Sequence, residues 1–204
     1  MAKDARCVAR PKNKVEGPVR LTAGRWSGSV TRSMGLSPAK ISIASQPPRA
    51  VIRIVGRAAV ERARDFDDAV RRLVGEGVRE LYLDLKDCPL LDSTFSGAVA
   101  LLAEERVGSD PMIRFVLVDA KTRIVDGLSN LEVLPLLRVA EPGEAAVVSS
   151  PLVDLPASQR SRQDAGEFCL RAHRALMALS PSNEVRFREL ESMLVAELGE
   201  VRKP

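Results

Sequence analysis

An acid and two hydroxyls stand together where the sequence predicts that a strand ends and a helix begins. Asp92, Ser93 and Thr94 follow the alternating segment ELYLDL, and a run of strong helix formers, AVALLAEE, comes soon after them. Such side chains cap helices, because their oxygens accept hydrogen bonds from the unpaired N–H groups of the first turn. A serine hydroxyl in this place can also receive a phosphoryl group, whose negative charge suits the positive end of a helix. Both roles, helix cap and chemical switch, are open for Ser93.

The other reactive side chains form no recognisable catalytic or metal-binding pattern. His173 is the only histidine, no Gly-x-Ser-x-Gly elbow accompanies it, and we expect a packing or surface role for it. The three cysteines have neither disulfide nor zinc spacing, and Cys88 is expected to be a buried, inert thiol. Asp84 and Asp87 are expected to be solvated loop carboxylates. No phosphate-binding loop or dinucleotide fingerprint occurs. The sequence therefore predicts a protein that is not an enzyme, without catalytic residues, cofactor or metal.

The composition predicts an aliphatic core and argues against two classes of partner. Of the 204 residues, 45% are hydrophobic but only 3% are aromatic, which leaves few rings to stack on nucleic-acid bases. No run of about 18 apolar residues occurs, so we expect no membrane span. Cysteines without a disulfide framework are typical of a cytoplasmic protein, and this is the location that we expect.

The basic charge of the chain is concentrated at its start. Residues 1–33 carry eight basic and two acidic side chains, whereas the whole chain has a net charge of +4. Residues 1–38 lack helical or strand periodicity, and we expect them to form a disordered basic tail. The charges are scattered rather than clustered, which favours a solvated tail over one that binds nucleic acid or anionic lipid. Met34 is an alternative starting residue, in which case the tail would not belong to the native protein.

Residues 39–150 have the pattern of an α/β domain. KISIAS and AVIRIVG alternate apolar and polar residues around a proline-containing turn, which predicts a hairpin. DFDDAVRRLVGEG has apolar residues at helical spacing, and MIRFVLVDA is apolar enough for a strand buried on both faces. Further elements are a helix from about Ser93 to Arg106, a short helix and loop in TRIVDGLSNLEVLPLL, and a strand, turn and helix start in RVAEPGEAAVVS. The order β-β-α-β-α-β-α-β predicts a mixed β-sheet with helices packed against it.

Residues 151–204 predict a C-terminal helical extension. Ser180 and Pro181 are expected to cap and begin the second of two helices. Each helix has one apolar stripe, formed by Phe168, Ala172, Ala175, Leu176 and Leu179 in the first and by Phe187, Leu190, Leu194 and Leu198 in the second. Two short helices with one apolar face each are not stable alone. We expect them to dock on the sheet domain, on each other or on a partner.

The segment from about Ala39 to Ser149 resembles the STAS domain, the fold of bacterial anti-sigma factor antagonists. The resemblance rests on RAVIRIVGRA, ELYLDLKDCPLLDSTFSGAVALLAE and MIRFVLVDAKTRIVDGLSNL. The family commonly has Asp-Ser-Ser/Thr-Gly-Leu-Gly at the start of the helix; here Phe95 and Ser96 take the Gly-Leu places, and Gly97 matches. A variant with Asp-Ser-Thr-Phe and a C-terminal helical extension is similar to this chain.

The resemblance implies a non-enzymatic cytoplasmic regulator in bacterial signal transduction and transcription. Ser93 would be the phosphoacceptor, with Thr94 as second choice, and phosphorylation would weaken the docking of an anti-sigma factor or serine kinase. Phe95 is expected to enlarge the surface that such a kinase faces. The partner-binding residues implied are Asp92, Ser93, Thr94, Phe95, Ser96 and Gly97.

Two alternatives remain open at the level of the sequence. In one, the domain docks on the ATPase of a membrane transporter, and the serine is only a helix cap. In the other, the protein is a scaffold that forms homo-oligomers through its helical arm without phosphorylation.

Overall fold

The computed structural model of the chain describes residues 39–141, 144 and 148–201. The predicted basic tail, residues 1–38, lies outside the described residues and stays a prediction. The first described elements are two antiparallel strands, β1 (Lys40–Gln46) and β2 (Arg49–Val55). Their pairing places Ile41 opposite Ile54 and turns both side chains into the core. Alternating apolar residues thus build the hairpin that the sequence predicts.

One mixed sheet organises the domain. Its strand order is β5-β4-β3-β2-β1-β6, with parallel pairing from β2 through β5 and antiparallel pairing of β1 with both β2 and β6. The four further strands are β3 (Glu80–Asp84), β4 (Arg114–Val118), β5 (Arg138–Val139) and β6 (Val153–Leu155). Phe115 to Val118 of β4 are all buried, as the continuous apolar run predicts.

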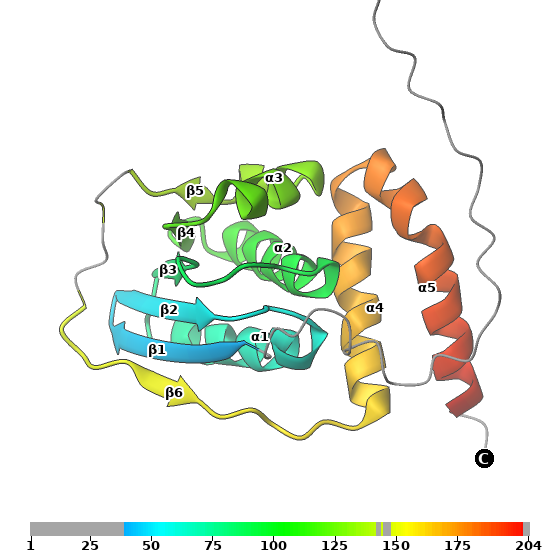
Figure 1. Cartoon of the computed structure of the whole chain (residues 1–204), viewed down its shortest axis with the longest axis horizontal. Helices are drawn as coiled ribbons and strands as arrows, with labels where there is room; N and C mark the ends of the chain where they lie inside the picture. The colour runs from blue at the N-terminus through cyan, green and yellow to red at the C-terminus, as the bar shows by residue number, and fades with distance from the viewer. Residues whose placement is uncertain (1–38, 142–143, 145–147, 202–204) are drawn as a thin grey trace, which may run out of the picture. The chain divides into compact units, whose positions relative to one another are not determined.

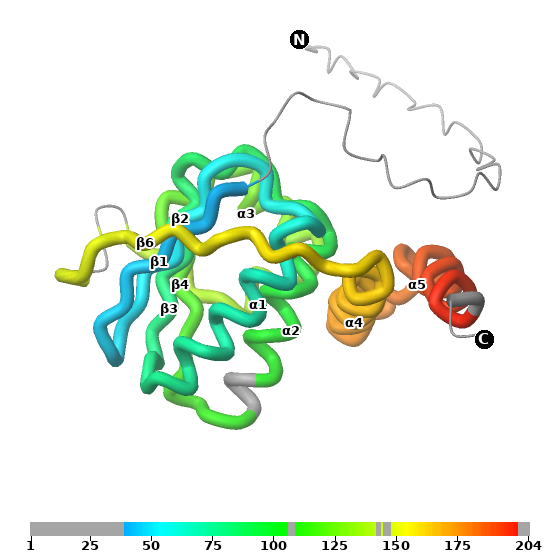
Figure 2. The backbone as a smooth tube through the Cα atoms, turned by 90° about the horizontal axis from the view of Figure 1, so that it is seen from below, coloured from blue at the N-terminus to red at the C-terminus, as the bar shows by residue number. Residues whose placement is uncertain are grey.

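Two helices cover one face of the sheet, as Figures 1 and 2 show. They are α1 (Val60–Gly75), which joins β2 to β3, and α2 (Ser93–Ser109), which joins β3 to β4. The predicted stripe of α1, from Phe66 to Leu73, is buried against the sheet and α2. Because β2 and β3 are parallel and both helices return over the same face, the two helices begin at the same edge of the sheet. Helix α3 (Thr122–Asn130) and a 3₁₀ turn, η1 (Leu134–Leu136), connect β4 to β5.

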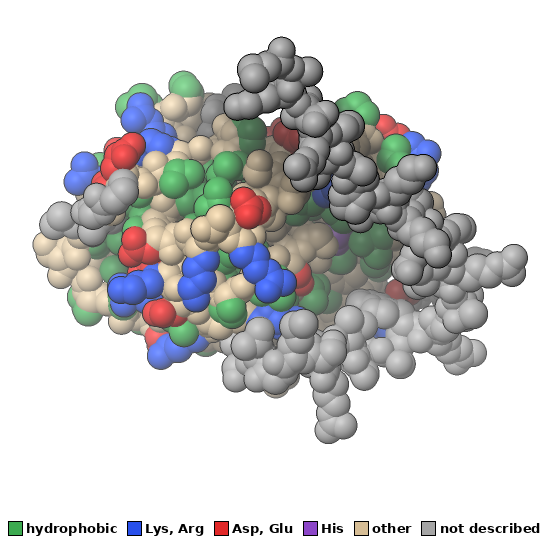
Figure 3. Space-filling view, turned by 45° about the horizontal axis from the view of Figure 1, so that its top comes forward, with side chains coloured by type: hydrophobic (Ala, Val, Ile, Leu, Met, Phe, Trp, Pro, Cys, Tyr) green, Lys and Arg blue, Asp and Glu red, His purple; other side chains and the backbone are tan. Residues whose placement is uncertain are grey.

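The opposite face of the sheet combines a small apolar cluster with charged pairs. Tyr82, Val116 and Val118 are buried there. Arg49 pairs with Glu80 at 2.8 Å, and on the same two strands Arg53 pairs with Asp84 at 2.7 Å. Acidic and basic side chains also lie close together on the face shown in Figure 3, with hydrophobic side chains between them.

The C-terminal arm consists of α4 (Arg162–Leu179) and α5 (Pro181–Val201), which lie side by side in Figures 1 and 2. The predicted cap is confirmed: the Asn183 N–H donates to Ser180 Oγ at 3.3 Å, and Pro181 is the first helical residue. Helix α4 docks on the domain through Phe168, Ala172 and Leu176, which belong to the same apolar core as the sheet. Helix α5 packs mainly on α4.

The expected α/β fold with a mixed sheet and a C-terminal helical arm is confirmed. The structure adds β6, which pairs with β1 across only three residues and has too short an apolar pattern to predict. Of the segment RVAEPGEAAVVS, the strand at Arg138 is confirmed, but residues 142–143 and 145–147 lie outside the described residues. The division at residue 150 stays a prediction, since α4 shares the core of the domain.

We predict that Leu176→Ala lowers the free energy of unfolding by about 2–5 kcal/mol, because it leaves a cavity in a core that arm and domain share. Urea unfolding followed by circular dichroism measures the change and should show one transition. Met193→Ala is the matched control, because Met193 of α5 is 56% exposed. Equal stability of the two variants, or separate transitions for arm and domain, would show that the shared core is wrong.

Candidate functional site at the start of α2

The carboxylate of Asp92 caps two helices at once. Its Oδ1 accepts from the Phe95 N–H in the first turn of α2 at 2.8 Å, and its Oδ2 accepts from the Val60 N–H at the start of α1 at 2.9 Å. The backbone N–H of Asp92 also donates to the Ala58 carbonyl at 2.9 Å. The cap on α2 is one of the roles that the sequence predicts. The cap on α1 explains why that helix begins at Val60, before its apolar stripe.

Burial raises the pKa of Asp92, and the two backbone hydrogen bonds oppose this rise because they favour the charged form. The side chain therefore carries a desolvation cost that its two N–H partners oppose without cancelling it. By accepting from the first turns of both helices, the Asp92 carboxylate holds the β2–α1 and β3–α2 connections next to each other.

Ser93 contacts the C-terminal arm directly. Its Oγ lies 3.0 Å from Nε2 of His173, which is on α4. The other ring nitrogen of His173, Nδ1, lies 2.8 Å from the carbonyl oxygen of Cys169. A carbonyl oxygen can only accept, so Nδ1 carries the hydrogen, and Nε2 of the neutral ring accepts a hydrogen bond from the Ser93 hydroxyl. Burial lowers the pKa of His173, which favours this neutral form.

His173 is thus a packing residue with a specific polar partner. It is 1% exposed, and its ring makes an edge contact with Phe187 of α5 at 5.0 Å between centroids. The sequence predicts a packing or surface role for His173 and gives no sign of the contact with Ser93. The two residues are 80 positions apart, and no local pattern marks the pair.

Thr94 also faces the arm. Its Oγ1 lies 3.5 Å from Sγ of Cys169, and the residue is 5% exposed. Burial raises the pKa of the Cys169 thiol, and burial likewise raises that of Cys88. Cys88 is fully buried, as the sequence predicts, whereas Cys169 of α4 is half-buried and faces α2.

Phe95 does not enlarge the surface, and that expectation is wrong. Its side chain is completely buried, and its ring lies 4.9 Å from the ring of Phe66 on α1. The aromatic ring fills the space between α1 and α2, and it stabilises their packing rather than a contact with a partner. Ser96 is buried as well.

Gly97 lies against the backbone of α4. A Cβ atom at this position would come within 2.4 Å of the carbonyl oxygen of Ala172. Only glycine permits so close an approach of two helices. Gly97 is therefore a point of close approach between α2 and α4.

A charged group borders this contact. Asp67 of α1 is fully buried and accepts from Arg71 of the same helix at 2.9 and 3.0 Å, while Arg171 of α4 approaches it at 3.4 Å. The hydrogen bond with Asp67 raises the pKa of Arg71, despite partial burial. The guanidinium groups of Arg171 and Arg64 lie over the ring of Phe168 at 5.2 and 5.5 Å from its centroid.

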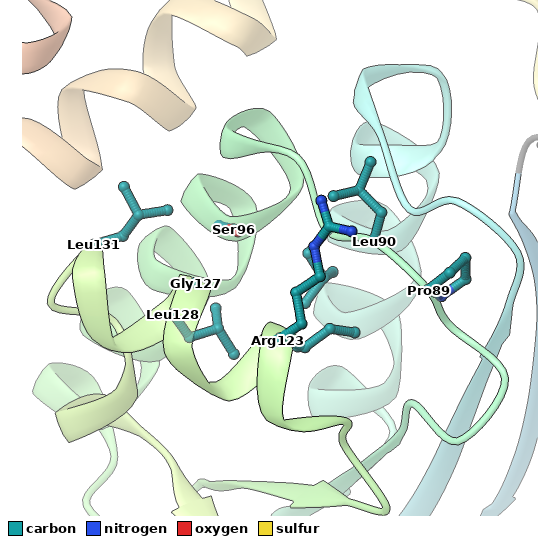
Figure 4. A pocket seen from close by; sticks show the side chains of 9 residues that line it. Pro89, Leu90, Ser96, Arg123, Gly127, Leu128 and Leu131 are labelled. Carbon is teal, nitrogen blue, oxygen red and sulfur yellow. The ribbon is translucent and has the colours of Figure 1, made fainter. Parts of the chain in front are cut away.

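An apolar cavity of about 150 Å³ lies beside the site, between the loop before α2 and helix α3 (Figure 4). Leu90, Leu128 and Leu131 line it, Ser96 contributes from α2, and the side chain of Arg123 reaches across it from α3. Ser93 is not part of its lining. A serine nucleophile needs a bound substrate next to it, so this cavity does not make Ser93 and His173 a catalytic pair.

The six predicted partner-binding residues are therefore brought together, and three of them, Ser93, Thr94 and Gly97, contact the arm of the same chain. Asp92 and Ser93 are half-buried, and the following four residues are buried. Their role in binding a partner stays a prediction. Asp84, one of the two acids expected to be solvated, pairs with Arg53. Within the described ranges, no cluster of three or more His, Cys, Asp or Glu suits a metal ion, and no helix is long and apolar enough to cross a membrane.

Comparison with solved structures finds ten similar chains. No protein-family model matches the sequence, and no curated protein matches it. The chain is similar to the NMR structure of the protein TM1081, with 17% identity, a TM-score of 0.44, and coverage of 48% of this chain and 78% of that one. It is also similar to the unphosphorylated anti-sigma factor antagonist SpoIIAA, with 16% identity, a TM-score of 0.43, and coverage of 50% and 88%.

We predict that Asp92→Ala lowers the free energy of unfolding by about 1–4 kcal/mol, because two caps worth about 0.5–2 kcal/mol each are lost. Asp92→Asn should fall between Asp92→Ala and wild type, since its one carbonyl oxygen can still accept. Chemical unfolding measures both. Asp126→Ala, at an exposed position on α3, is the control. If Asp92→Ala is as mild as Asp126→Ala, the double cap contributes nothing.

We predict that acid weakens the fold through His173. Burial lowers the pKa of His173 in the folded protein, so the ring takes up its proton at a lower pH than in the unfolded chain. The free energy of unfolding therefore falls as the pH drops below 6.5, the ordinary pKa of histidine, and it stops falling below the lowered pKa. Asp92, Cys169 and Ser93 are the polar groups facing the ring.

Because the chain has a single histidine, His173→Gln removes this part of the pH dependence entirely. Proton NMR of the imidazole C2–H gives the pKa directly. A titration midpoint at or above 6.5 in the folded protein would contradict the burial of a neutral ring.

Proposed function

We propose that the protein is a STAS-type regulatory binding protein, similar to anti-sigma factor antagonists, that acts in the cytoplasm of a bacterium and is switched by phosphorylation at Ser93. The partner would be an anti-sigma factor or serine kinase that docks on the surface around Asp92–Gly97. The motif Asp-Ser-Thr at a strand-to-helix junction supports the proposal. The different exposure of the Ser93, Thr94 and Ser96 hydroxyls supports the choice of Ser93.

The observation that carries the choice is the difference in exposure within the segment. Thr94 and Ser96 are 5% and 2% exposed, whereas Ser93 is only half-buried. A kinase must reach the oxygen that it modifies. Ser93 is therefore the first of the three hydroxyls that a kinase could approach, and Thr94 remains the second choice.

The phosphoryl transfer needs a kinase that uses ATP as the donor. The γ-phosphoryl group would pass to Ser93 Oγ, the bond to the leaving oxygen of ADP would break, and the hydroxyl proton would go to a base of the kinase. The phosphate on Ser93 would place a charge of about −1.5 to −2 at the start of α2. The helix terminus tolerates an anion, but Asp92 next to it repels one. The added charge would change what the surface binds without removing the Asp92 caps.

A second candidate, self-association through the arm, has one observation in its favour. Val185, Met193 and Val195 of α5 are 69%, 56% and 46% exposed, which leaves apolar side chains on the outside of the arm. In this case the arm would join two copies of the chain, and Ser93 would remain a structural residue. Size-exclusion chromatography with light scattering of wild type and Val195→Glu separates this function from the first, because only a dimer would dissociate.

We predict that the chain purified from the cells that produce it naturally carries a phosphate on Ser93. Phosphopeptide mass spectrometry locates the group. Ser93→Ala should abolish the modification, whereas Thr94→Val should leave it in place. A phosphate that persists in Ser93→Ala would contradict the assignment.

The binding half of the proposal is tested with Ser93→Ala and Ser93→Glu as paired baits. A protein retained by Ser93→Ala and lost by Ser93→Glu supports the switch if it also phosphorylates the wild-type chain with ATP. Equal retention by both baits would sink the switch. Ser129→Glu controls for added charge alone, because Ser129 is exposed on α3.

A further inference from the structure

The surface that the N-terminal halves of α1 and α2 present is filled by one helix of the same chain. Phe168, Ala172 and Leu176, spaced four residues apart on α4, are 2%, 0% and 0% exposed. Side chains at this spacing share one face of a helix. Ala172 meets Gly97, and Phe168 lies under the guanidinium groups of Arg64 and Arg171. The surface is therefore shaped to receive a helix with a small residue between two large apolar ones.

Polar contacts join the same surface to α4. They link Ser93 to His173 at 3.0 Å, Thr94 to Cys169 at 3.5 Å and Asp67 to Arg171 at 3.4 Å. Two of the three pairs involve the hydroxyls of Ser93 and Thr94. A chemical change at either hydroxyl would therefore change how α4 docks.

Polar contacts tie the arm to the rest of the domain at other places as well. The Asn183 amide donates to the Leu131 carbonyl at 2.8 Å, and Arg186 donates to the Asn130 carbonyl at 3.0 Å. The connection before α4, residues 156–161, has no helix or strand, but Ser158 donates to Asp65 and Arg160 pairs with Asp68 at 2.6 Å, both on α1. Because α5 packs mainly on α4, a displacement of α4 would carry α5 with it.

We infer that α4 is a displaceable internal ligand of the α1–α2 surface, and that a phosphate on Ser93 displaces it. The inference rests on the proposed function for the identity of the modified residue. A separation of 3.0 Å between Ser93 Oγ and His173 Nε2 holds one hydrogen and has no space for a phosphorus atom with three oxygens. The phosphate would also add charge beside Asp92 under a covered, low-dielectric contact.

The kind of partner follows from the same footprint. A protein that binds here must remove α4 and present a helix of the same chemistry: a small residue opposite Gly97, with large apolar residues four positions before and after it. Helix-in-groove recognition of this kind uses the spacing of the α4 stripe. A phosphate on Ser93 has no more space under a partner helix on this footprint than under α4, so phosphorylation also weakens the docking of the partner, as the proposed function requires.

The thiols of the chain provide the test. In a Cys7→Ser background, Cys169 reports on α4 because it faces Thr94, and Cys88 reports on the domain because it is fully buried. Iodoacetamide labelling with peptide mapping gives both rates. We expect Ser93→Glu to label Cys169 about tenfold faster than wild type, a shift of about 1.4 kcal/mol in docking, with Cys88 unchanged. An unchanged Cys169 rate would overturn the inference.

Gly97→Ala is the second variant, since its methyl group would meet the Ala172 backbone at 2.4 Å and push α4 away without adding charge. Gly127→Ala, where an added Cβ has no atom within 4 Å, and Ser129→Glu are the matched controls and should keep the wild-type rate. If Cys169 is labelled faster in Gly97→Ala but not in Ser93→Glu, a phosphate on Ser93 does not displace α4. Equal acceleration of Cys88 would mean unfolding of the domain and would contradict a separable arm.

The outcomes separate this inference from the proposed function. Glutamate replaces phosphate, so labelling does not depend on whether a kinase modifies Ser93 in cells. A chain without phosphate in cells but with a released arm in Ser93→Glu would defeat only the proposed function. A phosphorylated chain whose Cys169 stays protected would defeat only the inference.

Discussion

The two oxygens of the Asp92 carboxylate each accept from the start of a different helix, and the geometry of the site follows from this sharing. With α1 and α2 held at one point, their first turns form a continuous surface at the edge of the sheet. Phe66 and Phe95 fill the space between the two helices from inside. The carboxylate lies in a poorly solvated place, which raises its pKa, and its hydrogen bonds oppose that cost without cancelling it. The geometry of this strand-to-helix junction and the position of Ser93 thus depend on one side chain.

Helix α4 occupies the surface that this junction creates, and it does so through residues suited to close approach. Gly97 admits the backbone of Ala172, and Ser93 finds an acceptor in a neutral, buried imidazole. The hydroxyl that could serve as a switch is therefore also a structural hydrogen-bond donor. Capping and signalling, which look like competing roles in the sequence, are compatible here, because Asp92 performs the capping and leaves the hydroxyl of Ser93 for the arm.

Local patterns predicted much of the fold, and they failed where contacts join distant parts of the chain. Alternation predicted the β1–β2 hairpin, and helical spacing predicted the buried stripes of α1 and α4. The cap of Asp92 on α1 spans 32 positions and the Ser93–His173 contact spans 80, so neither leaves a periodic trace. Phe95 was misplaced for a related reason: a residue at the start of a helix looks exposed until the packing of a second helix against it is known.

In the unmodified chain, α4 lies directly on the start of α2. A nuclear Overhauser spectrum of the labelled full-length protein measures this contact. We expect cross-peaks from the Gly97 Hα protons to the Ala172 methyl group and from the His173 ring to the Ser93 Hβ protons. If both pairs lack cross-peaks while those between β1 and β2 are present, the arm does not cover the site, and the account is contradicted.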